Sequence, residues 1–131
     1  MTKYMKSSHF LHEARERFRF LRDANFTGPE EGDYWLSYGS GTIGVEVHFD
    51  DRDGRVITVI RATVGDRNPR ASLHCLYVRA GLGVAQDVKE IARSARMVAQ
   101  VLESQAAGLR QLLPIIEGPA GPEVMLACHG R

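Results

Sequence analysis

The sequence predicts one α+β domain: an N-terminal helix, a three-stranded antiparallel meander, a short helix and a long C-terminal helix packed on one sheet face. Apolar residues recur every three or four positions over residues 8–24 and 84–116, which is the period of an amphipathic helix. Residues 42–49 instead alternate between apolar and polar side chains, as a half-buried strand does. The length of 131 residues suits a single core, so we expect residues 1–131 to form one domain.

The first helix is expected to run from Ser8, as its N-cap, to about Ala24. The stretch 28–32, which contains two glycines and a proline, then ends it. The apolar stripe of this helix consists of Phe10, Leu11, Ala14, Phe18 and Leu21. Their spacing predicts that one side of the helix is buried.

Three strands are expected next, at Tyr34–Tyr38, Thr42–Phe49 and Arg55–Val64. Asp53 followed by Gly54 is a strong hairpin signal, because both residue types suit a tight turn with positive φ. The third strand carries apolar residues on both of its faces. Together these segments predict an antiparallel meander.

A short helix is predicted over 72–80, with Ser72 as its N-cap and Gly81 as its stop. The apolar residues at helical spacing are Leu73, Leu76, Tyr77 and Ala80. A fourth strand is the alternative, because Leu73, Cys75 and Tyr77 also alternate. We favour the helix.

The last long element is predicted to be a helix of about 30 residues, some 45 Å in length, over 84–116. Its apolar stripe is interrupted by Gln105, and Gly108 or Pro114 is expected to bend or end it. Residues 118–131 are expected to be a linker and an apolar tail that packs back on the domain or adds to a sheet edge.

The length of this helix has two interpretations. Its apolar stripe covers one sheet face, or the part that extends beyond the domain pairs with a second copy to form a homodimer. The residues expected to mediate this self-association are Val98, Leu102, Leu109 and Leu112.

Charge and composition argue against several classes of partner. The formal net charge is +1 and the basic residues form no block, so we expect no nucleic-acid partner. The N-terminus lacks the apolar core of a signal peptide, and no apolar stretch approaches the roughly 20 residues that span a bilayer. The two cysteines, Cys75 and Cys128, are too few for a disulfide framework. These observations predict a cytoplasmic protein without a membrane partner.

Three motifs resemble ligand sites but have the wrong context. Gly39, Gly41 and Gly44 match a dinucleotide-binding pattern, yet an alternating strand follows them instead of a helix, so a tight hairpin is predicted. The aspartates within 50–53 lack the spacing of a calcium loop. The adjacent histidine and cysteine residues at 74–75 and 128–129 lack the spacing of zinc ligands. We therefore expect no cofactor and no metal.

One arrangement of acidic residues suggests an enzyme. Metal-dependent nucleases of the restriction-endonuclease type place an acid at the start of one strand and E-x-K on the next, and the two acids hold Mg²⁺. Asp33 and Glu46 stand at the two acidic positions of a similar pattern, and His48 replaces the lysine. A divalent-metal-dependent nuclease is therefore an alternative function, and a small-ligand site between the meander and the long helix is another.

Trp35 motivates a binding hypothesis. If Tyr34, Leu36 and Tyr38 face the helices, Trp35 lies on the open face of the sheet, where an aromatic residue in a polar surround is typical of an interaction hot spot. The residues expected around it are Glu46, His48, Ile57, Val59 and Arg61. The opposite register, with Trp35 buried, agrees equally well with the sequence.

The segments Tyr34–Tyr38, Val45–Asp50 and Asp53–Val56 resemble those of small, uncharacterised bacterial α+β proteins. Some of these proteins look like immunity proteins, which bind and neutralise a toxin. The resemblance implies a protein-binding module and not a catalyst. A non-catalytic interaction through the open sheet face is therefore the first hypothesis.

Overall fold

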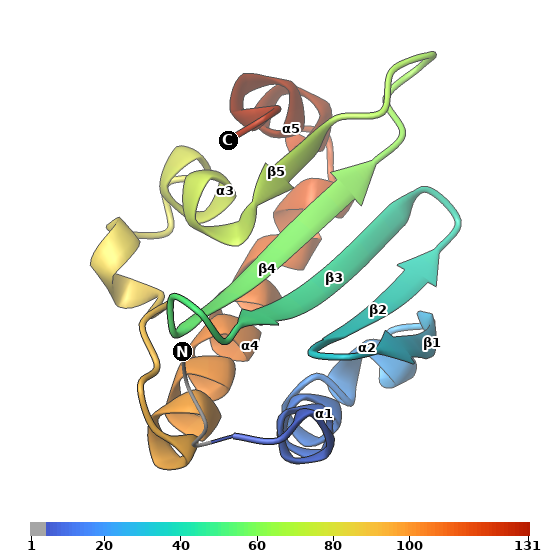
Figure 1. Ribbon diagram of the computed structural model, residues 1–131. Helices are drawn as coiled ribbons and strands as arrows, with labels where there is room; N and C mark the ends of the chain where they lie inside the picture. Colours follow the sequence, from blue (N-terminus) through green and yellow to red (C-terminus); the bar gives the residue numbers. More distant parts are fainter. Residues whose placement is uncertain (1–4) are drawn as a thin grey trace.

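The computed structural model describes residues 5–131, which form a five-stranded antiparallel sheet with helices on one of its faces (Figure 1). The strands follow one another across the sheet in sequence order. They are β1 (Thr27–Gly32), β2 (Trp35–Ser40), β3 (Ile43–Asp50), β4 (Arg55–Ala62) and β5 (Arg70–Ser72). The helices are α1 (Ser7–Arg17), α2 (Phe20–Asp23), α3 (Leu73–Arg79), the 3₁₀ turn η1 (Ala85–Asp87), α4 (Ala95–Glu117) and α5 (Gly121–Cys128).

The α+β class, the N-terminal helix and the long C-terminal helix are confirmed, whereas the prediction of three strands is wrong. β1 and β5 flank the predicted meander at its two edges. β1 contains two glycines, Pro29 and two glutamates, and its side chains are exposed or half-buried, so it has no apolar alternation. β5 has only three residues. Neither segment carries the periodic pattern that identifies a strand.

The predicted first helix is divided into α1 and α2, and its N-cap differs from the prediction. The cap position is Lys6, and Ser8 lies inside α1. The hydroxyl of Ser7 accepts a hydrogen bond from the backbone N–H of Tyr34, 3.1 Å away, and so joins the helix start to the sheet. The predicted stripe is otherwise correct: Phe10, Ala14, Phe18 and Leu21 are buried, and Leu11 packs against the core.

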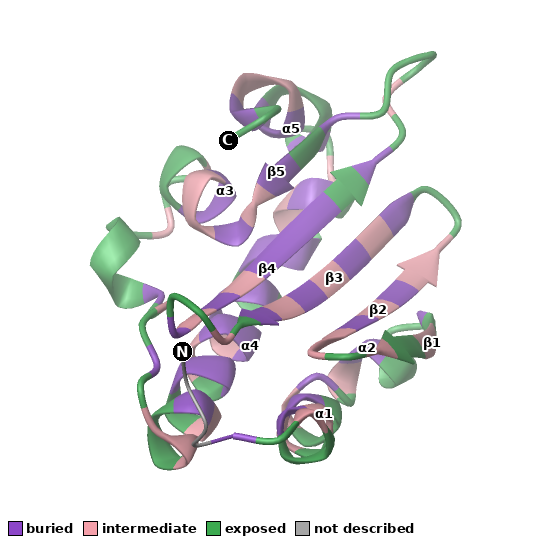
Figure 2. Cartoon of the chain, in the orientation of Figure 1, coloured by how far each residue is buried: buried purple, intermediate pink, exposed green. Residues whose placement is uncertain are grey.

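β3 shows the expected alternation of buried and half-buried side chains (Figure 2). Its buried residues are Ile43, Val45, Val47 and Phe49. In the neighbouring strands Leu36, Tyr38, Val56 and Ile60 are buried on the same side. This side of the sheet faces the helical layer and forms the core.

The predicted short helix is confirmed as α3. The side chain of Ser72 caps it by accepting a hydrogen bond from the N–H of Cys75. Gly81, the expected stop, has a positive φ of 78°. The alternative strand is limited to residues 70–72, directly before the helix.

α4 begins at Ala95 and not near Val84, so the predicted start of the long helix is wrong. Residues 88–92 instead run beside the start of β4. The N–H of Val56 donates to the carbonyl of Glu90 (2.9 Å), and the N–H of Ala92 donates to that of Gly54 (2.7 Å). These bonds to a distant strand replace the helical bonds that the local spacing of apolar residues predicts.

The polar residue that interrupts the apolar stripe, Gln105, is fully buried and connects three segments. Its Nε2 donates to the carbonyl of Val56 in β4 (2.7 Å) and to that of Lys89 (2.8 Å). Its Oε1 accepts a bond of 2.6 Å from the hydroxyl of Thr58, which is also buried. A buried amide must be hydrogen-bonded, and here its bonds hold α4, β4 and residues 88–92 together.

The 23 residues of α4 span about 35 Å, and the helix continues through Gly108 and Pro114. Val98, Leu102, Leu109 and Leu112 each have 0% exposure within one chain. They pack in the core, so they are not available for the predicted seam between two copies. Of the two interpretations, the structure supports the one in which the stripe covers the sheet.

The two cysteines form a disulfide that joins α3 to α5, a pairing that the sequence did not predict. The Cα atoms of Cys75 and Cys128 lie 5.9 Å apart, with a sequence separation of 53 residues. The expected tail is therefore a helix that packs back on the domain. Beyond this helix, the N–H of Gly130 donates to the carbonyl of Arg70 (2.8 Å). The backbone N–H of Arg70 in turn donates to Nδ1 of His129 (3.0 Å). The C-terminal residues thus occupy the outer edge of β5.

Within the described part of the chain, no helix is both long and apolar enough to cross a membrane.

Replacement of Gln105 by alanine is expected to lower the free energy of unfolding by roughly 3–5 kcal/mol, because each buried polar group left without a partner costs about 1–3 kcal/mol. Chemical denaturation would measure the change. Gln111→Ala is the matched control: Gln111 is an exposed glutamine of the same helix, and its replacement should change stability by less than about 0.5 kcal/mol. Equal effects of the two changes would refute the role given to Gln105.

Loss of the disulfide is expected to lower the free energy of unfolding by about 4 kcal/mol, because the bond closes a long loop in the unfolded chain. Denaturation of the oxidised protein and of the Cys75→Ser/Cys128→Ser variant would measure this difference. Thiol titration of the unreduced protein should find no free thiol, and two free thiols would contradict the pairing.

Candidate functional site

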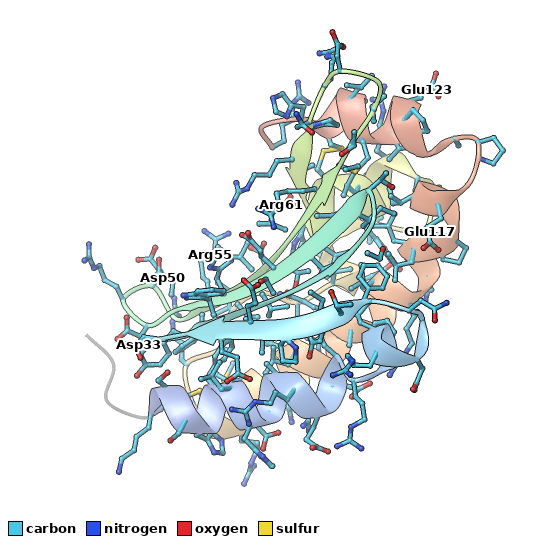
Figure 3. All side chains as sticks on the ribbon, turned by 90° about the vertical axis from the view of Figure 1, so that its right-hand side faces the viewer. Asp33, Asp50, Arg55, Arg61, Glu117 and Glu123 are labelled. Carbon is cyan, nitrogen blue, oxygen red and sulfur yellow. A yellow bond between two sulfur atoms is a disulfide. The ribbon has the colours of Figure 1, made fainter. Side chains whose placement is uncertain are left out.

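The face of the sheet away from the helices is open to solvent (Figure 3). Arg55 and Arg61 of β4 project from it, whereas Glu117 and Glu123 lie on the helical side. Leu36 and Tyr38 are buried, and Trp35, of opposite parity on the same strand, is only half-buried. Of the two registers that the sequence allows, the structure therefore has the one with Trp35 on the open face.

The strand register brings all six predicted partner-binding residues to this face. One row across the sheet is Trp35, His48 and Ile57, and the next is Ser37, Glu46, Val59 and Ser72. A third row is Gly39, Gly44, Arg61 and Arg70. Arg70, which the sequence analysis did not select, comes from the unpredicted strand β5.

Trp35 lies over Gly32 of the neighbouring strand. A Cβ atom on Gly32 would come within 2.1 Å of the indole Nε1, so a side chain at this position would require the ring to shift. The ring is thus supported by the backbone of β1 and remains partly exposed.

Glu46 is the centre of the charged part of the open face. Its carboxylate lies 3.0 Å from Nη1 of Arg61, 3.1 Å from Nε2 of His48 and 3.8 Å from Nη2 of Arg70. The Glu46 side chain is 18% exposed, whereas those of Arg61 and Arg70 are 49% and 55% exposed. One shielded carboxylate therefore orients two arginines that remain accessible.

A groove of about 530 Å³ lies at the end of the open face where β2 and β3 meet in a hairpin. The glycine-rich stretch 39–44 forms this hairpin as predicted, and Gly41 has a positive φ of 45°. Gly39 and Gly44 pair directly across the two strands and line the groove. Glu30 of β1 lines it on one side, and Arg61 of β4 lines it on the other. The sequence analysis explained the glycines by the turn alone and missed the groove.

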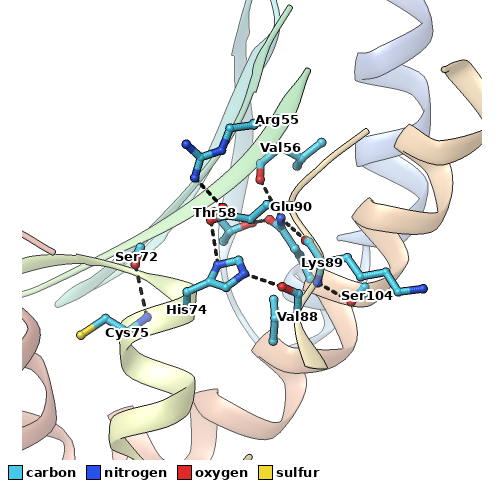
Figure 4. Close-up of polar contacts among 11 residues, drawn as sticks. Arg55, Val56, Thr58, Ser72, His74, Cys75, Val88, Lys89, Glu90 and Ser104 are labelled. Atoms are coloured by element: carbon cyan, nitrogen blue, oxygen red, sulfur yellow. Dashed lines mark hydrogen bonds and ion pairs between the residues drawn. The ribbon is translucent and has the colours of Figure 1, made fainter. Parts of the chain in front are cut away.

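A second charged cluster, also missed, lies beside the start of β4 (Figure 4). Glu90 pairs with the guanidinium of Arg55 and, at 2.8 Å, with Nδ1 of His74. The other ring nitrogen of His74 contacts the carbonyl of Val88. The hydrogen bond with Glu90 raises the pKa of Arg55. Because both nitrogens of His74 have partners, we interpret this cluster as a link between α3, β4 and residues 88–90.

The acidic pair of the nuclease hypothesis is not brought together with a third metal ligand. Asp33 lies in the turn between β1 and β2, near Asp50 at the end of the sheet (Figure 3). Glu46 lies on β3, opposite Ser37 in the middle of β2, and it forms ion pairs with Arg61 and Arg70. Among residues 5–131 there is no group of three or more histidine, cysteine, aspartate or glutamate residues positioned to hold a metal ion.

A smaller hollow of about 260 Å³ lies where the ends of β3 and β4 meet α4 and α5. Ile43, Val64, Ile116 and Met125 are among the residues that line it. This hollow corresponds in position to the small-ligand site expected between the meander and the long helix.

Two ionisable residues near β1 have shifted pKa values. Burial, with a smaller contribution from the charge of Glu31, raises the pKa of Tyr38 above its ordinary value of 10.0. A hydrogen bond from Arg15 lowers the pKa of Glu31. The Arg15–Glu31 pair joins α1 to the edge strand.

No protein-family model matches this sequence, and no curated protein or solved structure matches it significantly. The function is therefore argued from the residues of the chain.

The stability of the protein should fall as pH rises above about 10. Tyr38 keeps its proton in the folded state at a pH where the unfolded chain releases it, so the folded state is favoured below this range and loses that advantage above it. Denaturation between pH 8 and 11 should show a shallower decline for Tyr38→Phe than for the wild type. The difference in the free energy of unfolding between the two proteins at pH 7 gives the pH-independent effect of the lost hydroxyl, which is then subtracted. Identical slopes would contradict the assignment.

Proposed function

We propose that this protein is a non-catalytic interaction module that binds a protein partner through the open face of its sheet. The observation that carries the proposal is the half-exposed Trp35 on a face that no helix of the described chain covers, and that also carries the accessible Arg61 and Arg70. Tryptophan and arginine are the residue types most enriched among interaction hot spots.

The ion pairs of the Glu46 carboxylate favour a binding function over metal-dependent catalysis. A carboxylate that holds Mg²⁺ must direct its oxygens at the ion, but Oε2 of Glu46 lies 3.0 Å from Arg61 and Oε1 lies 3.8 Å from Arg70. The same ion pairs orient Arg61, which is useful for recognition. The resemblance to immunity proteins also implies a protein partner.

The place where the protein acts is part of this proposal. The sequence predicts the cytoplasm, but a disulfide such as Cys75–Cys128 forms and persists mainly in oxidising compartments. We therefore favour an oxidising compartment for the module over the cytoplasm.

The proposal predicts that Trp35→Ala weakens partner binding at least thirtyfold, because hot-spot residues contribute about 2 kcal/mol or more. Affinity capture and mass spectrometry would identify the partner, and titration calorimetry with the purified partner would give affinity and stoichiometry. Met97→Ala is the control, since it removes an exposed apolar side chain from the helical side. A 1:1 complex with equal affinity for both variants would place the interface elsewhere.

A further inference from the structure

The groove at the glycine hairpin indicates the chemistry of the partner. We propose that it takes an acidic segment of the partner protein, with an aspartate or glutamate side chain bound to Arg61. This inference rests on the proposed function and deepens it, since it names what the partner presents to one end of the open face.

Arg61 is arranged to bind a carboxylate. Glu46 holds its Nη1 at 3.0 Å, which fixes the guanidinium over Gly44. A Cβ atom on residue 44 would lie only 3.1 Å from Nη2 and 3.3 Å from Nε, so glycine leaves the space that the guanidinium occupies. A planar guanidinium whose position is already fixed can bind a carboxylate through two parallel hydrogen bonds with little loss of entropy.

The charges around Glu46 leave an excess of positive charge. Arg61 and Arg70 share this single carboxylate, and each guanidinium has five N–H donors. Both arginines are about half exposed, whereas Glu46 is largely shielded, so an approaching molecule meets the cations first. An acidic group of a partner in the groove would bind the N–H donors of Arg61 that Glu46 leaves free.

The shape of the groove suits a polypeptide segment. Gly39 has no atom nearer than 4.0 Å to the position that a Cβ would take, so the floor of the groove is open and lets a backbone approach closely. The serine and threonine residues that line it are Thr27, Ser37, Ser40, Thr42 and Thr63. Glu30 lies on the β1 side and repels an acidic group, which therefore enters on the side of Arg61.

The test uses a capped heptapeptide of alternating glycine and glutamate, and the same peptide with glutamine. Titration into isotope-labelled protein would be followed by NMR through the amides of Gly39 and Gly44 and the Nε–H of Arg61. The glutamate peptide should give saturable shifts at these groups, and the glutamine peptide should not. Arg61→Gln should weaken binding tenfold or more, since a hydrogen bond to a charged group contributes about 1.5–3 kcal/mol.

Three further variants sharpen the test. Arg61→Lys keeps the charge but not the paired donors, so its affinity should lie between those of the wild type and Arg61→Gln. Glu30→Gln should bind the peptide more tightly, because it removes a repulsive charge. Arg96→Gln, which changes an exposed arginine of α4, should bind as the wild type does. The dispersion of each spectrum shows whether the variant is folded.

Equal binding of the two peptides, or unchanged binding by folded Arg61→Gln, would overturn the inference. Tighter binding of inorganic phosphate than of the glutamate peptide at the same groups would overturn it as well. If an identified partner loses affinity with Trp35→Ala but not with Arg61→Gln, the proposed function stands and this inference fails. Peptide binding that depends on Arg61, in a protein with no protein partner, would support the groove chemistry and refute the proposed function.

Discussion

The buried amide of Gln105 is the contact on which the arrangement of the two layers depends. Apolar burial is non-directional, so leucine and valine contacts alone do not specify single partners for α4. Gln105 has partners in one position only: the carbonyls of Val56 and Lys89 and the hydroxyl of Thr58. Its three bonds therefore fix α4 relative to β4 and to residues 88–92.

Local sequence patterns identified the elements that owe their form to local periodicity. The alternation in β3, the stripe of α1 and the cap of α3 by Ser72 each lie within one segment and were predicted correctly. The errors arose where a distant segment decides the conformation. Val88 has helical spacing relative to α4, but its segment is extended because it bonds to β4. The disulfide likewise depends on the packing of α5 against α3, which two cysteines 53 residues apart do not indicate.

The sequence predicted six residues of the candidate site, but neither Arg70 nor the geometry that joins them. The six residues chosen around Trp35 have the parity of one face, and the register of β2, β3 and β4 places them there. The parity itself was undecided, because Trp35 and Leu36 are both apolar enough to be buried. The groove depends on Gly39 lying opposite Gly44, and the second charged cluster joins Arg55, His74 and Glu90 from three segments. These relations exist only after the strands have paired.

The edges of the sheet explain why a partner is expected to recognise side chains and not to add a strand. Pro29 and two glutamates in β1 make that edge unfavourable for another strand. At the other edge, Gly130 and His129 already bond to the backbone of Arg70. The open face remains, and it avoids the large apolar patch that promotes aggregation, because Val59 is only 7% exposed and the same face carries Glu46, Arg61 and Arg70. Such a face is stable in water without a partner, yet it presents an aromatic ring and two oriented arginines to a surface that matches them.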